Sequence, residues 1–405
     1  MGFGNDIVLI IICVFVLGAY LEESGLSRYM ANWFISRKIG EGRPWVFTLL
    51  IFSAAYVLSA FVSLYATIVI IWGIFYQICT LTGIKKHSSY AAMVIAGIVI
   101  ICSLTGNIFP FKAFGQIMIG LVQSGTGLAA EVSFIPWFLF NFIVSILLIA
   151  AYLLAARFLL KPDIEPIREA GKNLAYLRTE KMDDKQKLAM VILCLFIASQ
   201  VLPSFMPKGW AVTAWLNNVG ILGAVTLCMV ALMVLRNGDN EPVTDVSRLL
   251  RKGVNWELVV LMAATVPLSG ALEAEETGVL ATVMAWMLEK FGNLSAVAFL
   301  VVVVVLFLVV TQFAHNLILM LVFTPILAKM GLAFGIAPMV VASLIYFTAQ
   351  SAFLTPASSS QAALIFGNTD WVSKKYAYAY GALYIAVAAL VIVCCGIPLA
   401  QFFFG

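Results

Sequence analysis

The polar residue that most demands a chemical explanation is a lysine inside an apolar stretch. Lys112 closes the segment Gly106-Asn107-Ile108-Phe109-Pro110-Phe111-Lys112. A charged side chain at the centre of a membrane helix costs about 2.5 to 3.5 kcal/mol on insertion scales, and such residues usually have a partner or a function. The ammonium would therefore bind an anion or stand where a cation binds, or else the side chain extends along the helix to the membrane surface.

Uncharged polar residues mark the middle of two further apolar regions, 44–84 and 293–333. They are Ser59, Ser63 and Thr67 in the first region, and Thr311, Gln312, His315 and Asn316 in the second. A polar turn at membrane depth is tolerated where it lines a cavity, which favours a re-entrant hairpin over two full spans in each region. His315 would donate to an anion or carry a proton, or would only hydrogen-bond a backbone carbonyl at the turn.

Three consecutive serines, Ser358, Ser359 and Ser360, follow Pro356 in another apolar segment. Their hydroxyl groups, and the backbone amides at a helix start, can both donate to a carboxylate or a sulfate. A serine run of this kind indicates a polar cavity rather than packing against lipid.

The chain has no arrangement typical of an intramembrane enzyme. Its histidines, His87 and His315, are not followed by glutamate, so an HExxH zinc site is excluded. The seven cysteines show no metal-binding spacing and are interpreted as packing residues. Glu273, Glu275 and Glu276 are assigned to a solvated outer loop, and no acidic residue is expected at the membrane midplane of either repeat. The net charge of +4 gives no indication of nucleic-acid binding.

Composition places the whole chain in a membrane. Of its 405 residues, 63% are apolar and 11% are charged, and the mean hydropathy is +1.03, outside the usual range of soluble domains. Apolar stretches of about 17 to 25 residues recur, the length that a helix needs to cross the hydrocarbon core. Valine and isoleucine run on without the alternation of a barrel strand, which predicts an all-α polytopic membrane protein.

Lysines and arginines predict the orientation of the connecting loops. Spans or broken spans are expected near residues 6–21, 90–124, 134–160, 187–206, 217–235, 255–272, 337–370 and 376–402. The basic segment 161–187 is assigned to the cytoplasm. Counting spans from it also places inside the basic residues of 28–43, 85–86, 236–254 and 374–375. Segments 125–133, 207–216 and 273–292 fall outside with one lysine at most apiece, so a multi-pass protein of the cell membrane is expected.

An internal repeat predicts two copies of one unit with inverted topology. Two similar motifs each end a span: Glu22-Glu23-Ser24-Gly25 and Glu275-Glu276-Thr277-Gly278. A second pair, Ser59-Ala60-Phe61 and Thr311-Gln312-Phe313, follows, and its two members are separated by nearly the same number of positions as those of the first pair. Inverted repeats with broken helices are characteristic of secondary transporters. The predicted parts are a first inverted repeat at 1–124, with hairpin 44–84 and broken helix 90–124; connecting spans at 125–254, with cytoplasmic loops 161–187 and 236–254; a second inverted repeat at 255–370, with hairpin 293–333 and broken helix 337–370; and a C-terminal span at 371–405.

Several of these motifs resemble the divalent anion/sodium symporter family of the ion transporter superfamily. In the second copy they are Thr311-Gln312-Phe313-Ala314-His315-Asn316 through Pro325, and Ala352-Phe353-Leu354-Thr355-Pro356 through Phe366-Gly367; in the first they are Leu58-Ser59-Ala60-Phe61-Val62-Ser63, and Pro110 through Gly120. The resemblance covers essentially the whole chain with degenerate motifs, and relative to the family a portion of about two N-terminal spans is expected to be missing.

The resemblance implies a cation-coupled secondary active transporter of a dicarboxylate, tricarboxylate or sulfate. It implies sodium as the coupling ion with no other cofactor, an elevator-like movement, a homodimer and contact with membrane lipid. The residues assigned to the anion are Ser63, Lys112, His315, Asn316, Thr355, Ser359 and Ser360. Those assigned to sodium are Ser59, Ser63, Thr311, Ala314, Asn316 and Ser358.

The chain departs from the family at the first cation site. The first tip reads Ser63-Leu64-Tyr65, without the family's asparagine, and Lys112 stands near the first helix break. We therefore expect the Lys112 ammonium to replace one sodium ion or to face the anion.

The alternatives to sodium symport are a sodium-independent anion exchanger and a proton-coupled carrier. The alternatives to a carrier are an anion channel and a non-transporting sensor.

Overall fold

The computed structural model describes residues 3–4, 6–40, 42–127, 132–170, 181–207, 210–236, 242–257 and 292–405, with isolated positions between 259 and 290. Its principal helices are α1 Asp6–Glu23, α2 Leu26–Ile35, α3 Pro44–Phe61, α4 Leu64–Thr82, α5 Ser89–Leu104, α6 Ala113–Thr126, α7 Phe134–Ala155, α8 Glu165–Ala170, α9 Asp184–Phe205, α10 Ala211–Val234, α11 Val246–Gly253, α14 Ala296–Val310, α15 Asn316–Ala333, α16 Pro338–Ala349, α17 Ser360–Gly367, α18 Lys374–Val391 and α19 Ile397–Phe404. Among the described residues, 8 helices are long and apolar enough to cross a membrane, or up to 9 if the bent pair α1 and α2 forms one span. The prediction of an all-α polytopic membrane protein is confirmed.

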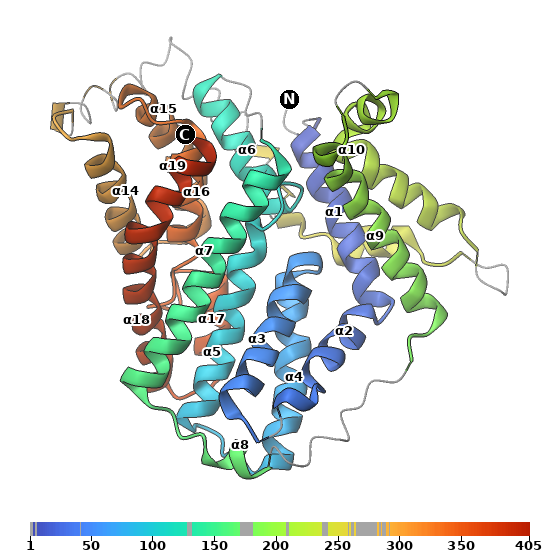
Figure 1. The fold of residues 1–405 in the computed structure, drawn as a ribbon, viewed down its shortest axis with the longest axis vertical. Coiled ribbons are helices and arrows are strands. Elements are labelled where there is room, and N and C mark those ends of the chain that lie inside the picture. Colours follow the sequence, from blue (N-terminus) through green and yellow to red (C-terminus); the bar gives the residue numbers. More distant parts are fainter. Residues whose placement is uncertain are drawn as a thin grey trace.

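Two helix pairs lie where re-entrant hairpins were predicted. α3 ends at Phe61 and α4 begins at Leu64, while α14 ends at Val310 and α15 begins at Asn316. Both pairs turn near the mid-height of the molecule, one rising from its lower end and the other descending from its upper end (Figure 1). The polar residues of the two regions therefore lie at or beside the turns, away from both ends of the molecule.

Both predicted broken helices are interrupted. The first runs as α5 to Leu104 and resumes as α6 at Ala113, and the second runs as α16 to Ala349 and resumes as α17 at Ser360. Pro110 and Pro356 lie in the two interruptions, where a proline fits because no helical N–H is required. The second repeat begins in a region that is mostly outside the described residues, including the predicted span 255–272 and Glu273, Glu275 and Glu276, so the division into inverted repeats stays a prediction.

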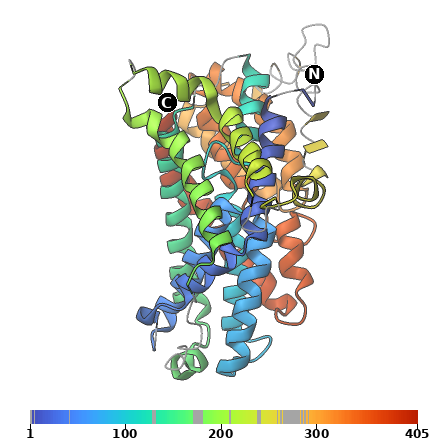
Figure 2. The ribbon, with the colours of Figure 1, turned by 90° about the vertical axis from the view of Figure 1, so that its right-hand side faces the viewer.

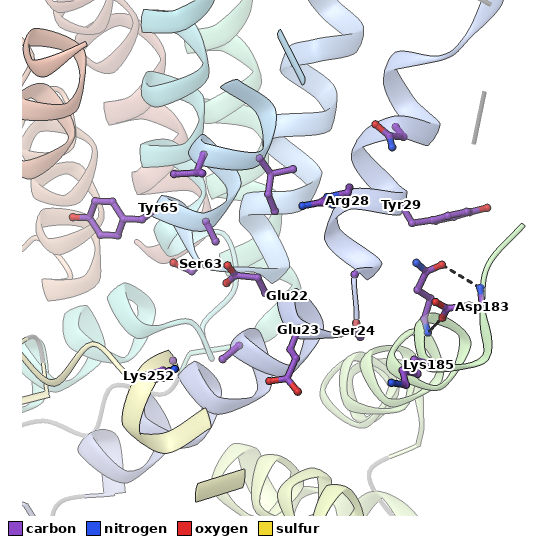
Figure 3. A pocket seen from close by; sticks show the side chains of 18 of the residues that line it. Glu22, Glu23, Ser24, Arg28, Tyr29, Ser63, Tyr65, Asp183, Lys185 and Lys252 are labelled. Carbon is purple, nitrogen blue, oxygen red and sulfur yellow. Dashed lines mark hydrogen bonds between the residues drawn. The ribbon is translucent and has the colours of Figure 1, made fainter. Parts of the chain in front are cut away.

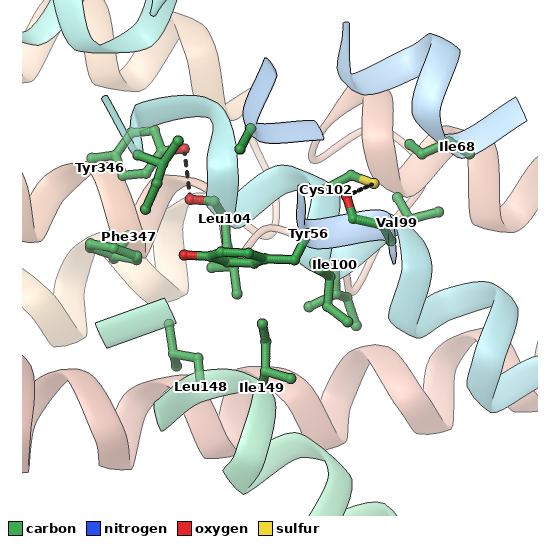
Figure 4. Close-up of a cluster of buried hydrophobic side chains, with 14 of the residues drawn as sticks. Tyr56, Ile68, Val99, Ile100, Cys102, Leu104, Leu148, Ile149, Tyr346 and Phe347 are labelled. Atoms are coloured by element: carbon green, nitrogen blue, oxygen red, sulfur yellow. Dashed lines mark hydrogen bonds between the residues drawn. The ribbon is translucent and has the colours of Figure 1, made fainter. Parts of the chain in front are cut away.

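The buried centre of the molecule is α5. In the span that contains it, 94% of the residues of the most apolar window are buried, which explains why this helix is apolar on all sides. Figure 4 shows part of the surrounding core, where Tyr56 of α3, Leu148 of α7 and Tyr346 of α16 lie in one cluster with residues of α5. α9 and α10 lie to one side, next to α1 (Figures 1 and 2).

Three of the lysine-bearing loops meet at one end of the molecule. The backbone N–H of His87 donates to the Trp371 carbonyl over 3.0 Å, and the N–H of Asp163 donates to the Ser89 hydroxyl over 3.1 Å. These contacts bring 85–86, the start of 161–187 and 374–375 to the same side, at the lower end in Figure 1. That grouping is what the cytoplasmic assignment requires.

Close helix packing between α6 and α15 depends on one glycine, and we expect its replacement to destabilise the protein. A Cβ on Gly125 would lie 2.5 Å from the Cα of Pro325, so Gly125→Ala should cost about 1 to 3 kcal/mol of stability through overpacking. Gly73→Ala in α4 is the control, because a Cβ added there would have no neighbour within 4 Å and alanine favours a helix. Thermal unfolding in detergent measures the difference, and equal melting temperatures for the two variants would contradict the packing argument.

Candidate functional site

The two hairpin turns and the two helix breaks converge on one cavity of about 190 Å³. Its lining comprises Phe61 to Tyr65 of the first turn, Gly106 and Lys112 to Phe114 of the first break, His315 to Leu317 of the second turn, Ser360 and Gln361 at the start of α17, Val14, Phe15 and Gly18 of α1, and Gly253, Asn255 and Glu257. Residues from distant parts of the chain thus form a single chamber in which a few polar groups stand among apolar side chains. Such a chamber is the usual form of a small-molecule site.

At the first turn, Lys112 interacts with the end of α3. Its ammonium donates to the backbone carbonyl of Ser59 and lies 3.5 Å from the carbonyl oxygen of Val62. The Ser59 hydroxyl donates to the Ala55 carbonyl over 2.6 Å and accepts from the Thr105 hydroxyl over 2.7 Å. The lysine therefore points into the protein and binds freed helix carbonyls, in the manner of a bound cation, instead of extending to the surface.

At the second turn, the tip is held against the second break by its backbone. The N–H of Asn316 donates to the Ser358 carbonyl over 2.9 Å, and the Asn316 side chain donates to the Ala349 carbonyl over 3.1 Å. The carbonyl oxygens of Thr311 and Ala314 accept no hydrogen bond from the described part of the chain. Thr311, Ala314, Asn316 and Ser358, the four residues assigned to a second cation, are thus adjacent along the tip and the break.

The structure divides the seven residues assigned to the anion into two groups. Those that line the cavity are Ser63, Lys112, His315, Asn316 and Ser360. The hydroxyls of the other two are used within the protein: Thr355 donates to the Gln312 carbonyl over 2.8 Å, and Ser359 donates to the Ala352 carbonyl over 2.7 Å while accepting from the Ala362 N–H over 2.9 Å. Thr355 and Ser359 therefore shape the break next to the cavity.

An acidic residue also lines the cavity. Glu257, a solvent-exposed residue at the start of the predicted span 255–272, lines the chamber together with Lys112 and His315. Among the described residues, no hydrogen-bond partner is found for the buried Nδ1 atom of His315, which gives no support to the interpretation that this nitrogen bonds a backbone carbonyl.

A wide vestibule of about 1310 Å³ adjoins the cavity. It shares Ser63, Tyr65 and Gly253 with the inner chamber. Figure 3 shows the first-hairpin residues Ser63 and Tyr65 on one side of the vestibule and Asp183 and Lys185, at the start of α9, on the other. Basic and acidic side chains both line it, so charged groups stand beside the entrance to the inner chamber.

A close contact between charged residues lies beside the vestibule. A guanidinium nitrogen of Arg248 in α11 donates to the carboxylate of Glu23 at the end of α1, and the Thr244 hydroxyl donates to the same oxygen over 3.2 Å. Glu22, the neighbouring carboxylate, faces the vestibule. The C-terminal end of α1 is thereby fastened to α11 at the edge of the polar route.

The model of the citrate transporter family, CitMHS, matches residues 1–400. The chain belongs to the citrate transporter family. It is 21% identical over 388 residues to the sodium-dependent dicarboxylate transporter SdcS of Staphylococcus saprophyticus, a match that covers 93% of this chain and 73% of that protein. The crystal structure of the YdaH transporter of Alcanivorax borkumensis, described as having an unusual topology, shares its fold with a TM-score of 0.62 and 16% identity, over 97% of this chain and 84% of that one.

Membership of the citrate transporter family confirms the resemblance drawn from the motifs. It also confirms that the chain is a multi-pass transport protein of the membrane and not an enzyme. The sequence did not reveal Glu257 or Tyr65 as residues of the chamber. The residues next to Glu257 and Tyr65 in the sequence do not mark either one as part of a site, because each reaches the cavity only through the packing of α4, α11 and the hairpin tips.

Two neighbouring serines of this citrate transporter family member should differ in their effect on stability. Ser359→Ala removes the N-cap of α17 and should cost about 0.5 to 2 kcal/mol, whereas Ser360→Ala removes a hydroxyl from an exposed residue and should leave stability unchanged. Thermal unfolding of the two purified variants in detergent provides the comparison. A melting temperature lowered equally in both variants would contradict the assignment of Ser359 as the cap.

Proposed function

We propose that this protein is a cation-coupled secondary transporter of citrate or related di- and tricarboxylates, with sulfate as the alternative small anion. The observation that supports the proposal most directly is the convergence of both hairpin turns and both helix breaks, with their polar groups, on one chamber. Broken helices near the middle of a membrane supply backbone donors and carbonyl oxygens without the cost of further charged side chains. One chamber can therefore hold an anion and a cation together.

The charge of the chamber supports cation coupling. A di- or tricarboxylate entering it meets the solvent-exposed Glu257 carboxylate, and the like charges repel each other. The ammonium of Lys112, bound to the carbonyls of Ser59 and Val62, brings one positive charge, which offsets at most the charge of Glu257. An additional cation or proton would therefore balance the anion, and this favours coupling.

Sodium is our proposal for this cation, at the second turn. The carbonyls of Thr311 and Ala314, with Asn316 and Ser358, provide oxygen ligands of the kind that small hard cations prefer. The staphylococcal relative is described as sodium-dependent. At the first turn the equivalent carbonyls bind the Lys112 ammonium, so we propose that a single sodium site is retained and that Lys112 replaces the other.

Proton coupling is the second candidate, favoured by two groups in the chamber. His315 and Glu257 both line it, and the buried Nδ1 atom of His315 has no partner in the part of the chain that the structure describes. Imidazole changes its protonation near neutral pH. A sodium-independent anion exchanger would rely on the same Lys112 and would need no net cation movement.

We propose an elevator-like movement for the transport step. The vestibule opens beside the C-terminal end of α1, a region that the loop charges assign to the cytoplasm, so the structure would represent an inward-facing state. The turns and breaks would move together against a static part of the protein. α9 and α10, which expose apolar side chains such as Leu195 and Val234, would face lipid or a second copy in a homodimer.

Uptake into proteoliposomes tests the proposed function. Labelled citrate, succinate and sulfate should be compared under an inward sodium gradient, a potassium control and an imposed pH gradient. We expect sodium-driven accumulation of citrate or succinate. Accumulation driven by a pH gradient alone would reject the sodium site and support proton coupling through His315 and Glu257. Accumulation driven only by anion inside the vesicles would indicate an exchanger.

Lys112 should control the cation requirement. In Lys112→Ala the carbonyls of Ser59 and Val62 lose their cation, and we expect uptake at low sodium to fall by about tenfold, the effect of an unpaired buried polar group. High sodium should restore part of the activity by occupying the vacated position. Lys85→Ala, at an exposed lysine, is the control, and full activity of Lys112→Ala with unchanged cation dependence would reject the replacement of sodium by the ammonium.

A further inference from the structure

A buried glutamine joins the second hairpin turn to the second helix break. Gln312 is 3% exposed, and its amide nitrogen lies 2.8 Å from the Leu308 carbonyl oxygen and 3.2 Å from that of Ser351. Its amide oxygen accepts from the N–H groups of Phe353 and Leu354 over 3.2 and 3.1 Å. One side chain therefore binds three backbone groups of the break and one of its own hairpin.

These four contacts assign the orientation of the amide. Two N–H donors lie on the side of the oxygen and two carbonyl acceptors on the side of the nitrogen, so the reversed orientation would place donors against donors. The backbone of Gln312 adds a further link, because its carbonyl accepts from the Thr355 hydroxyl over 2.8 Å. Among the side chains of the turn, Gln312 makes the most contacts to the break that the structure describes.

The first half of the molecule joins its turn and break from the other side. When Ser59-Ala60-Phe61 is aligned with Thr311-Gln312-Phe313, Ala60 occupies the place of Gln312, and alanine has no group for such bonds. There the break supplies the side chain, since Lys112 reaches the carbonyls of Ser59 and Val62. The lysine brings its own positive charge to the turn, whereas the neutral glutamine brings none.

We propose that Gln312 is a positioning residue that holds the second turn and the second break at the spacing needed to bind the coupling cation. The inference rests on the proposed function, because it concerns the same cation site. Thr311 and Ala314 lie on the turn and Ser358 lies on the break, so the two sides of the site keep their separation only while turn and break are joined. Gln312 itself does not line the chamber and acts through these backbone groups.

Two variants of Gln312 and one control test the proposal. Gln312→Met keeps a similar length without polar atoms, and Gln312→Glu keeps the acceptor oxygens but loses the amide donors. Gln350→Met is the matched control, since Gln350 is a buried glutamine at the end of α16, 2% exposed, whose amide oxygen has no partner among the described residues. If Gln312→Met fails to fold, the more conservative Gln312→Glu carries the test.

Amide hydrogen exchange and transport kinetics provide independent readouts. In Gln312→Met we expect exchange at Phe353 and Leu354 to accelerate, and the sodium concentration for half-maximal uptake to rise, each by about tenfold for the loss of buried hydrogen bonds. Gln312→Glu should lie between this variant and the wild type. The KM for the anion at saturating sodium should change much less, and Gln350→Met should resemble the wild type in both readouts.

Three outcomes would overturn the proposal. Unchanged exchange at Phe353 and Leu354 in both Gln312 variants would show that the glutamine does not join turn and break. Faster exchange with an unchanged sodium requirement would show that the join does not position the cation site. Wild-type uptake that is indifferent to sodium would reject the proposed sodium site and with it this role of Gln312, while the exchange data would still report whether the join exists.

Discussion

Backbone groups released by broken helices must find partners inside the protein, because the surrounding membrane offers none. This requirement explains many of the polar contacts at the centre of the molecule. The indole N–H of Trp137 donates to the Asn107 carbonyl over 2.8 Å, the amide of Gln116 donates to the Pro110 carbonyl over 2.7 Å, and the Tyr346 hydroxyl donates to the Ser103 carbonyl over 2.9 Å. The first contact attaches α7 to the break, the second attaches the start of α6 to it, and the third attaches α16 to the end of α5 just before it. These contacts hold the first break in place.

The two halves meet this requirement with different chemistry. Lys112 binds the first turn from the break with a charged group, and Gln312 binds the second break from the turn with a neutral one. An ammonium that binds helix carbonyls does electrostatically what a bound cation would do there, and it cannot leave during a transport cycle. A turn held by an uncharged amide carries no positive charge that would repel an exchangeable cation. The difference between two similar turns is therefore the physical basis for proposing one exchangeable site instead of two.

The balance of charge around the chamber connects structure with transport. Glu257 lines the chamber and is solvent-exposed, and in the proposed function its charge disfavours binding of the anion alone and favours binding together with a cation. A coupled transporter needs this property, because an anion that binds well without its cation would cross the membrane without the gradient that drives it. The contact between Glu23 and Arg248 fastens α1 at the edge of the vestibule. Membership of the citrate transporter family supports the proposal that the chamber binds small carboxylates.

Local features of the sequence determined the class of the protein and the position of its irregular segments. Apolar length reveals spans, and polar residues such as Ser63 and His315 mark turns within apolar regions. Pro110 and Pro356 lie in the two helix breaks, whereas Pro325 lies inside α15, so a proline indicates a break only together with its neighbours. All of these effects act over a few residues, so they can be recognised without knowing the fold. The sequence alone also identified Lys112 as exceptional, since a charge in an apolar segment is costly in any arrangement.

Which partner the lysine finds depended on the tertiary structure, because Ser59 lies far from it along the chain and is brought to it only by the packing of α3 against α5 and the first break. The same reason explains why Thr355 and Ser359 bind the protein's own backbone while Ser360 faces the cavity. Contacts between distant segments are set by how whole helices pack, and the types of residue in one segment do not contain that information.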